Sequence, residues 1–174
     1  MEAVEPYLRE ILWRQCGAAI DMLENAIAAC PDEVWAAPDG PAKAGDCWYL
    51  AYHTLFWLDL YLDGAAEGFA PPAPFGLEEL DPAGRLPERA YTQDQLLAYL
   101  AHGREKCRAA VAGLTDQSAR RPCVFRWGEV AYVELLLYTM RHVQHHAAQM
   151  NRLLREATGS APHWVGITRR PLSR

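Results

Sequence analysis

Apolar residues recur at steps of three and four positions in four stretches of the chain, which is the period of an amphipathic helix. The first stretch, 7–29, carries charged residues on its other faces, and Pro6 suits its first turn. The last stretch, 129–157, is followed by Gly159 and Pro162, residue types that end helices. The pattern therefore predicts a long helix in each of these two regions.

Two further stretches predict helices in the middle of the chain. Asp46 suits the N-cap of a segment that runs to about Asp63 and is followed by Gly64. This segment is strongly aromatic, and aromatic residues also occur in strands, but its length and lack of alternation favour a helix. Residues 92–95, Thr-Gln-Asp-Gln, form a capping-box pattern that opens a helix to about Ala112.

Segments rich in proline and glycine separate the predicted helices. Residues 31–45 hold three prolines and two glycines, which predicts a connector with room for one short turn near 33–35. Residues 65–91 predict a long irregular crossover, and 113–128 a second connector. Loops as long as this crossover are uncommon inside compact domains and often serve as functional lids.

Four helices joined in this way predict an all-α fold, a four-helix bundle with a long irregular crossover between its second and third helices. We expect the whole chain, 1–174, to form a single domain in which the tail 158–174 packs irregularly on the body. The sequence leaves the pairing order of the helices open. The length of the crossover argues against a simple up-down-up-down order.

Composition and charge exclude several classes of function. The chain of 174 residues has a net charge of −5 and no basic stripe, which disfavours binding to polyanionic nucleic acid. No apolar stretch approaches the ~20 residues of a transmembrane helix, and the acidic first residues do not form a secretory signal. We therefore expect a cytoplasmic protein without membrane or nucleic-acid partners. The five cysteines contain no C-x-x-C pair, so free, mostly buried thiols are expected.

Histidines carry the main chemical signal. His142 and His146 lie four positions apart on the last predicted helix, which places both imidazoles on one face, one turn apart. Two such histidines can bind one divalent ion. Their stripe is otherwise mostly apolar, so we expect the pair to face the interior. Buried histidines that bind no metal are the alternative interpretation of this pair.

His53 is the candidate for a third ligand. It lies midway along the second predicted helix among aromatic residues, and a buried histidine needs a partner for its polar nitrogens. A metal ion would provide that partner. Three neutral histidines leave a further position on the ion open for water or substrate, the arrangement of catalytic zinc sites.

Four more residues are candidates for the surroundings of this site. Gln149 lies one turn beyond His146, where it could bond to a water molecule on the metal or simply pack between helices. Tyr138 and Trp57 could line a pocket or belong to the core. His145 is offset from the stripe by one residue, which suits a neighbouring group or a surface position.

The segment 138–155 resembles the last-helix signature of the DinB-like (DNA-damage-inducible) proteins. In that signature H-x3-H is followed three residues later by glutamine, here His142, His146 and Gln149. The segment 51–59 resembles the part of the second helix that contributes the first histidine in this family. The crossover and the Pro-His-Trp-Val sequence of the tail are also similar to one subgroup, so the resemblance covers nearly the whole chain.

The resemblance implies a four-helix bundle with an unusual crossover topology that is often dimeric, so a homodimer is expected. It also implies a three-histidine site for a divalent metal ion, commonly zinc or nickel, with His53, His142 and His146 as the ligands. Relatives with known activity are thiol-dependent transferases and isomerases that act with low-molecular-weight thiols. Many members of the family have no assigned activity.

Three hypotheses about function remain open at the level of sequence. The first is a divalent-metal-dependent enzyme, a hydrolase or a thiol S-transferase, whose ion activates water or a thiol; a small-molecule electrophile and a thiol cosubstrate would be its partners. The second is a non-catalytic metal-binding stress-response module whose ion joins two helices. The third is an interaction bundle with buried histidines and no metal.

Overall fold

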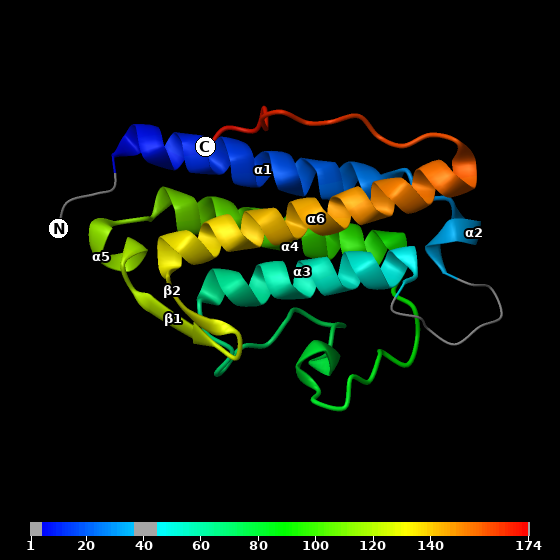
Figure 1. Ribbon diagram of the computed structural model, residues 1–174, viewed down its shortest axis with the longest axis horizontal. Coiled ribbons are helices and arrows are strands. Elements are labelled where there is room, and N and C mark those ends of the chain that lie inside the picture. Colours follow the sequence, from blue (N-terminus) through cyan, green and yellow to red (C-terminus); the bar gives the residue numbers. More distant parts are fainter. Residues whose placement is uncertain (1–4, 37–44, 174) are drawn as a thin grey trace.

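Four long helices lie side by side in the computed structural model, which describes residues 5–36 and 45–173 (Figure 1). The long helices are α1 (Pro6–Ala28), α3 (Cys47–Asp63), α4 (Gln93–Ala112) and α6 (Tyr132–Thr158). The shorter elements are α2 (Asp32–Trp35), the 3-10 turn η1 (Glu78–Leu80), α5 (Asp116–Ala119) and the strands β1 (Pro122–Phe125) and β2 (Gly128–Ala131). The predicted connector 31–45 lies partly outside the described residues.

Each long helix packs mainly against two of the other three. α1 and α3 each contact both α4 and α6, whereas they contact one another only sparsely. The colours of Figure 1 show that α1 and α6 run in one direction and α3 and α4 in the other. The long crossover therefore carries the chain back to the end of the molecule where α3 began, as its length indicated.

Local signals explain where these helices begin and end. The capping box at α4 is confirmed, because the Thr92 hydroxyl accepts from the Gln95 N–H and Gln95 Oε1 accepts from the Thr92 N–H. Gly64 ends α3 with φ of 77°, a left-handed conformation that glycine adopts without strain. Asp46 occupies the N-cap position of α3, but its side chain does not cap the backbone and instead accepts from Trp48 Nε1.

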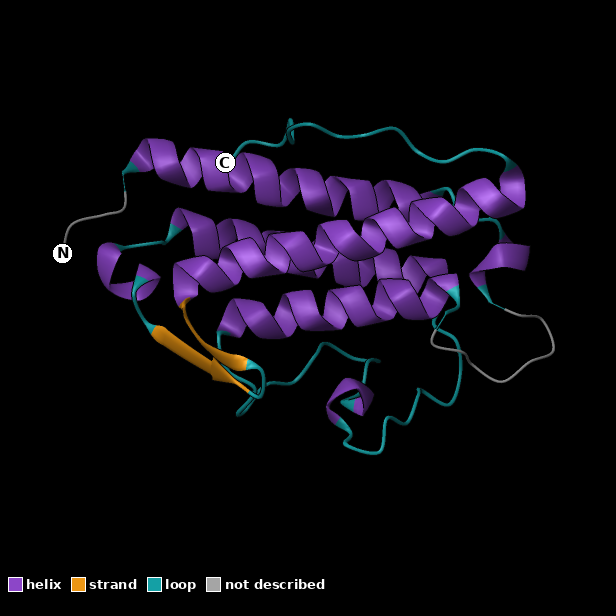
Figure 2. Cartoon of the chain, viewed as in Figure 1, coloured by secondary structure: helices purple, strands orange, loops and turns teal. Residues whose placement is uncertain are grey.

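A short hairpin corrects two predictions. The second connector contains α5 and the antiparallel pair β1–β2, drawn in orange in Figure 2, so the mostly helical fold includes a small sheet. Residues 129–131, predicted to open the last helix, belong to β2, and α6 begins at Tyr132. Four-residue strands are too short to show a clear alternation of buried and exposed positions, which is why the pattern missed them.

The aromatic segment forms a helix, as its length indicated, and it supplies much of the core. Trp48, Tyr52 and Phe56 of α3 have no exposed surface. Burial of each large apolar side chain contributes roughly 1.5–3 kcal/mol. All five cysteines are buried and free, as expected from the sequence. None of the described helices combines the length and apolar character needed to cross a membrane.

The tail that follows α6 runs back along α1 without regular secondary structure (Figure 2). The Thr168 N–H donates to the Arg14 carbonyl over 3.1 Å, and Trp13 Nε1 donates to the Arg170 carbonyl over 2.7 Å. Gly17 makes this close approach possible, because a Cβ at that position would lie 2.5 Å from Cγ2 of Thr168. The tail is therefore held against α1 by specific contacts.

Candidate metal centre

Three histidine side chains from two helices converge on one point. The helical period of α6 places His142 and His146 on successive turns, and α3 brings His53 opposite them. His142 Nε2 lies 3.3 Å from His53 Nε2 and 3.1 Å from His146 Nε2. The candidate ligand atoms of the three rings all lie within 4.8 Å of one another, and all three residues are partly buried.

The crossover fixes the orientation of His53. Glu79, in η1, places its Oε2 atom 2.7 Å from His53 Nδ1 and accepts from Trp57 Nε1 over 2.8 Å. Neighbouring Glu78 accepts from the Tyr52 hydroxyl over 3.0 Å and so helps to dock the turn on α3. A carboxylate on the outer nitrogen of a ligating histidine holds the ring in place and raises its basicity.

Gln149 has the corresponding role at His146. Its Oε1 atom lies 2.6 Å from His146 Nδ1, one turn along α6. The Nδ1 atom of His142 is different, because it is buried and has no hydrogen-bond partner among the described residues. The Nε2 atoms of all three rings therefore face the common point, while two of the three outer nitrogens are held by acceptor oxygens.

These hydrogen bonds determine where the protons lie on the neutral rings. A carboxylate can only accept, so Glu79 places the proton of His53 on Nδ1, and the Gln149 carbonyl does the same for His146. Both Nε2 lone pairs then face Nε2 of His142, which carries one proton at most. With all three rings neutral, at least one of these contacts opposes two lone pairs, and a cation at the common point would relieve that repulsion.

Burial keeps the His142 and His146 rings neutral. The pKa of His142 is lowered to about 3, first by burial and then by the neighbouring histidines. Burial also lowers the pKa of His146, although the bond to Gln149 opposes that effect. For Glu79 burial favours the neutral acid, but hydrogen bonds from His53 and other donors outweigh it and lower the pKa. His142 and His146 therefore offer neutral imidazole nitrogens close to the Glu79 carboxylate.

Two of the three separations between these nitrogens match those in a tetrahedral zinc site. Zinc binds histidine nitrogen at ~2.0–2.1 Å, so two nitrogens on a tetrahedral ion lie roughly 3.3 Å apart. The Nε2 separations from His142 to His53 and to His146, 3.3 and 3.1 Å, agree with that value. Imidazole nitrogens suit zinc, copper, iron and nickel, whereas magnesium and calcium prefer oxygen ligands.

An aromatic wall flanks the histidines on the side of the hairpin. The Trp127 ring, at the hairpin tip, stacks on Tyr138 with 4.5 Å between ring centroids, and its Nε1 donates to the Tyr61 hydroxyl. Tyr61 packs edge-on against Tyr138 and His142. Burial raises the pKa of Tyr61 well above its usual range, so its hydroxyl keeps its proton at neutral pH.

The four residues that the sequence suggested as neighbours of the site lie at different distances from the histidines. Gln149 contacts His146 directly, and Trp57 reaches the centre through Glu79. Tyr138 belongs to the aromatic wall. His145 is exposed, with its ring centroid 5.0 Å from that of His146, and it lies outside the converging set.

The sequence pattern did not single out Glu79, which lies in an irregular segment without periodicity. The only available signal was a pair of acidic residues, Glu78 and Glu79, within a crossover otherwise rich in proline and apolar residues. A pattern of that kind is common on protein surfaces. The pairing of Glu79 with His53 depends on how the crossover folds back over α3, which local sequence does not specify.

Comparison with protein families matches residues 15–150 to the family described as the DinB superfamily. The matched range includes all three histidines, Glu79 and Gln149. No curated protein matches the chain. The family match confirms the resemblance noted in the sequence and extends over well more than half of the residues, so the chain belongs to the DinB superfamily.

Proposed function

We propose that His53, His142 and His146 bind one divalent metal ion, zinc or nickel, and that this centre belongs to a metal-dependent enzyme of the hydrolase or thiol S-transferase type. The convergence of three histidine nitrogens, with Nε2 separations of 3.3 and 3.1 Å from His142, is the observation that carries the proposal. A four-helix bundle is the scaffold we infer for it. Membership of the DinB superfamily adds support, because the family is associated with metals.

The residues around the histidines prepare them to bind metal. Glu79 and Gln149 hold the protons of His53 and His146 on Nδ1, which leaves each Nε2 lone pair free for a ligand bond. Ligation requires neutral histidine, and burial keeps His142 neutral. When bound, a divalent ion acts as a Lewis acid toward a water molecule or a thiol.

The number of protein ligands supports a catalytic role over a structural one. Structural zinc sites commonly use four protein ligands, whereas catalytic sites use three and keep one position open. Among the described residues, only the three histidines form a group that could hold an ion at this point. Glu79 is engaged with His53 through its Oε2 atom and holds the ring from behind.

Metal analysis of the purified protein tests the proposal. We expect the tag-free protein, supplied with zinc or nickel near neutral pH, to retain about one ion per chain after gel filtration. Alanine substitutions of His53, His142 or His146 should each remove most of the metal. His163→Ala, at an exposed tail position, is the matched control and should leave the content unchanged. A wild-type protein that retains no metal would refute the proposal.

A non-catalytic metal site is the second candidate. The placement of the ligands on two helices is the observation that supports it. The histidines come from α3 and α6, so a bound ion would link the two helices. In that case His53→Ala should lose much of its thermal stability together with the metal. In the enzyme, the same variant should lose turnover of electrophilic or hydrolysable substrates while keeping most of its stability.

A further inference from the structure

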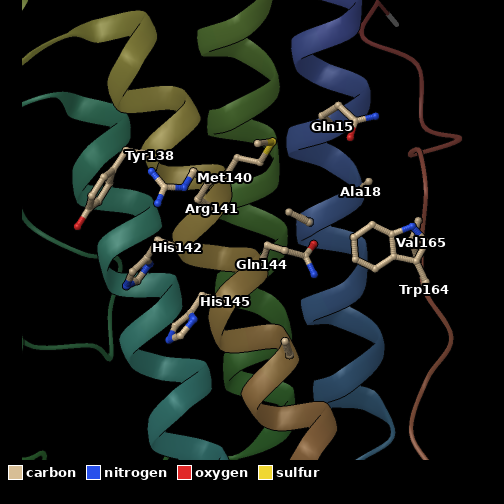
Figure 3. Close-up of a pocket in the computed structure, with 12 residues that line it drawn as sticks. Gln15, Ala18, Tyr138, Met140, Arg141, His142, Gln144, His145, Trp164 and Val165 are labelled. Carbon is tan, nitrogen blue, oxygen red and sulfur yellow. The ribbon is translucent and has the colours of Figure 1, made fainter.

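An open groove lies beside the metal centre, between α1, α6 and the tail (Figure 3). Its volume is about 600 Å³, within the range of pockets that bind small organic molecules. The tail forms one wall because its contacts with Arg14 and Trp13 hold it alongside α1. The groove is thus built from three segments that are distant in the sequence.

The charge of the groove is positive although the protein as a whole is acidic. The described residues that line it include no aspartate or glutamate, and Arg141 is the one among them with a permanent charge. The guanidinium of Arg141 makes no ion pair or hydrogen bond with any residue in the described ranges 5–36 and 45–173. His145, exposed one turn along α6, adds a second nitrogen-bearing side chain.

The groove has a polar end and an apolar end. Figure 3 shows Arg141, His142 and His145 toward one end, and Trp164, carried by the tail, at the other. Trp164 is 71% exposed, an unusual position for so large an apolar side chain. An apolar ligand against this ring would remove both surfaces from water.

The polar end of the groove adjoins the metal centre. His142 lines the groove and also belongs to the converging histidines, and Arg141 precedes it on α6. A ligand whose charged group contacts Arg141 would therefore have that group near the histidines and its apolar body directed toward Trp164.

We propose that this groove binds a small organic anion with an apolar body, with the anionic group at Arg141 and the body against Trp164. Guanidinium recognises carboxylate in a bidentate manner, and no neighbouring acid competes for it here. The inference rests on the proposed function in one respect, that chemistry on the bound anion would take place at the three histidines. Binding itself needs only Arg141 and the apolar wall.

NMR titration with 3-phenylpropanoate and its neutral analogue 3-phenylpropanamide tests the charge preference. The wild-type protein should bind the acid about tenfold more tightly than the amide. Arg141→Gln should abolish this difference while leaving the affinity for the amide unchanged. Arg152→Gln is the matched control, because Arg152 is an exposed arginine on α6 that pairs with Glu156 and should leave both affinities as they are.

Trp164→Ala tests the apolar end of the groove. Because this side chain is largely exposed, the variant should fold normally, and it should bind both probes severalfold more weakly. Any of three results would overturn the proposal. The wild-type protein could bind acid and amide equally well, or it could fail to bind the acid at concentrations up to about 20 millimolar. Arg141→Gln could also keep the wild-type preference for the acid.

Titrations of metal-loaded and chelator-treated protein separate this proposal from the metal site. Acid binding that persists without metal and still requires Arg141 supports the groove, even if the protein proves to bind no metal. Acid binding that requires metal but tolerates Arg141→Gln would mean that the carboxylate binds the ion directly. That result would overturn the groove proposal and leave the metal proposal intact.

Discussion

Glu79 is not one of the proposed ligands, but its side chain orients His53, which is one. Its single Oε2 atom contacts both His53 and Trp57, and the side chain is only 5% exposed. A carboxylate in this position fixes the tautomer of the histidine and directs Nε2 toward the common point. The geometry of the proposed metal site therefore depends on a residue of the crossover as well as on the two helices.

Replacing Glu79 with glutamine should weaken metal binding by about 10- to 100-fold, because the neutral amide holds the ring less firmly and no longer raises its basicity. Competition with a chromophoric chelator measures the affinity. Glu78→Gln is the matched control, since Glu78 bonds to Tyr52 and not to a histidine. Equal affinities of Glu79→Gln and the wild-type protein would show that Glu79 does not support the site.

The buried ring of His142 should make the stability of the metal-free protein depend on pH. In the unfolded chain this histidine takes up a proton near its ordinary pKa of 6.5, but in the folded protein only near 3. Between these values the unfolded state binds the extra proton, so the free energy of unfolding falls as the pH falls. The contribution of one such group is at most about 1.4 kcal/mol per pH unit.

Urea unfolding of chelator-treated protein at several pH values, from about 4 to about 7, measures this slope. His142→Gln should flatten the slope by up to about one proton, whereas His163→Ala should leave it unchanged. A slope that is identical in wild-type and His142→Gln protein would contradict the lowered pKa.

At the scale of elements, the contact between α1 and the tail depends on the missing side chain of Gly17. Gly17→Ala would place a Cβ within 2.5 Å of Thr168, and Cβ of Thr168 itself is only 2.9 Å away. We expect a loss of about 1–3 kcal/mol from this overpacking, larger than the gain in helix propensity of about 1 kcal/mol. Thermal denaturation measures the change.

The double variant Gly17→Ala/Thr168→Ala identifies the cause of that loss. It should recover part of the stability, because the closest atom, Cγ2 of Thr168, is removed. Thr168→Ala alone supplies the reference for the double-variant comparison. Additive effects of the two substitutions would mean that the clash is relieved elsewhere in the chain.

The long helices and the histidine pair could be predicted from the sequence because both follow the helical period. The hairpin could not, since strands of four residues show too little alternation, and so α6 was expected three residues early, at Glu129 instead of Tyr132. Glu79 was missed for a related reason. The fold of an irregular crossover is set by what it packs against, here Tyr52 and His53 of α3.

At the scale of the whole molecule, polar contacts join neighbouring helices at separate places. Arg104 of α4 pairs with Asp21 and Glu24 of α1. Asp59 of α3, which is 1% exposed, accepts from Lys106 Nζ over 2.6 Å and from the Tyr99 hydroxyl, both on α4. The histidines lie between α3 and α6. Each of these contacts specifies a helix pair that the hydrophobic pattern left open.

Replacing Lys106 alone should lower the free energy of unfolding more than replacing Lys106 and Asp59 together. Lys106→Met leaves the buried Asp59 carboxylate with only the Tyr99 hydroxyl and the His102 imidazole, 3.4 Å away, as partners. We expect a loss of up to about 3–5 kcal/mol in the free energy of unfolding. Lys106→Met/Asp59→Asn should regain a large part of it, because the amide carries no charge. Chemical denaturation of the three proteins provides the values, and a double variant no more stable than Lys106→Met would contradict this account.

The histidines lie far apart in the sequence, and this limits when a metal ion can bind during synthesis. His53 and His142 meet across 89 positions, so the ribosome must complete most of α6 before the nitrogens can converge. Metal therefore cannot template the folding of α1 or α3 as those helices emerge. We expect the ion to bind late, to a chain whose helices are already assembled. Metal content would then indicate the fraction of chains that have completed folding.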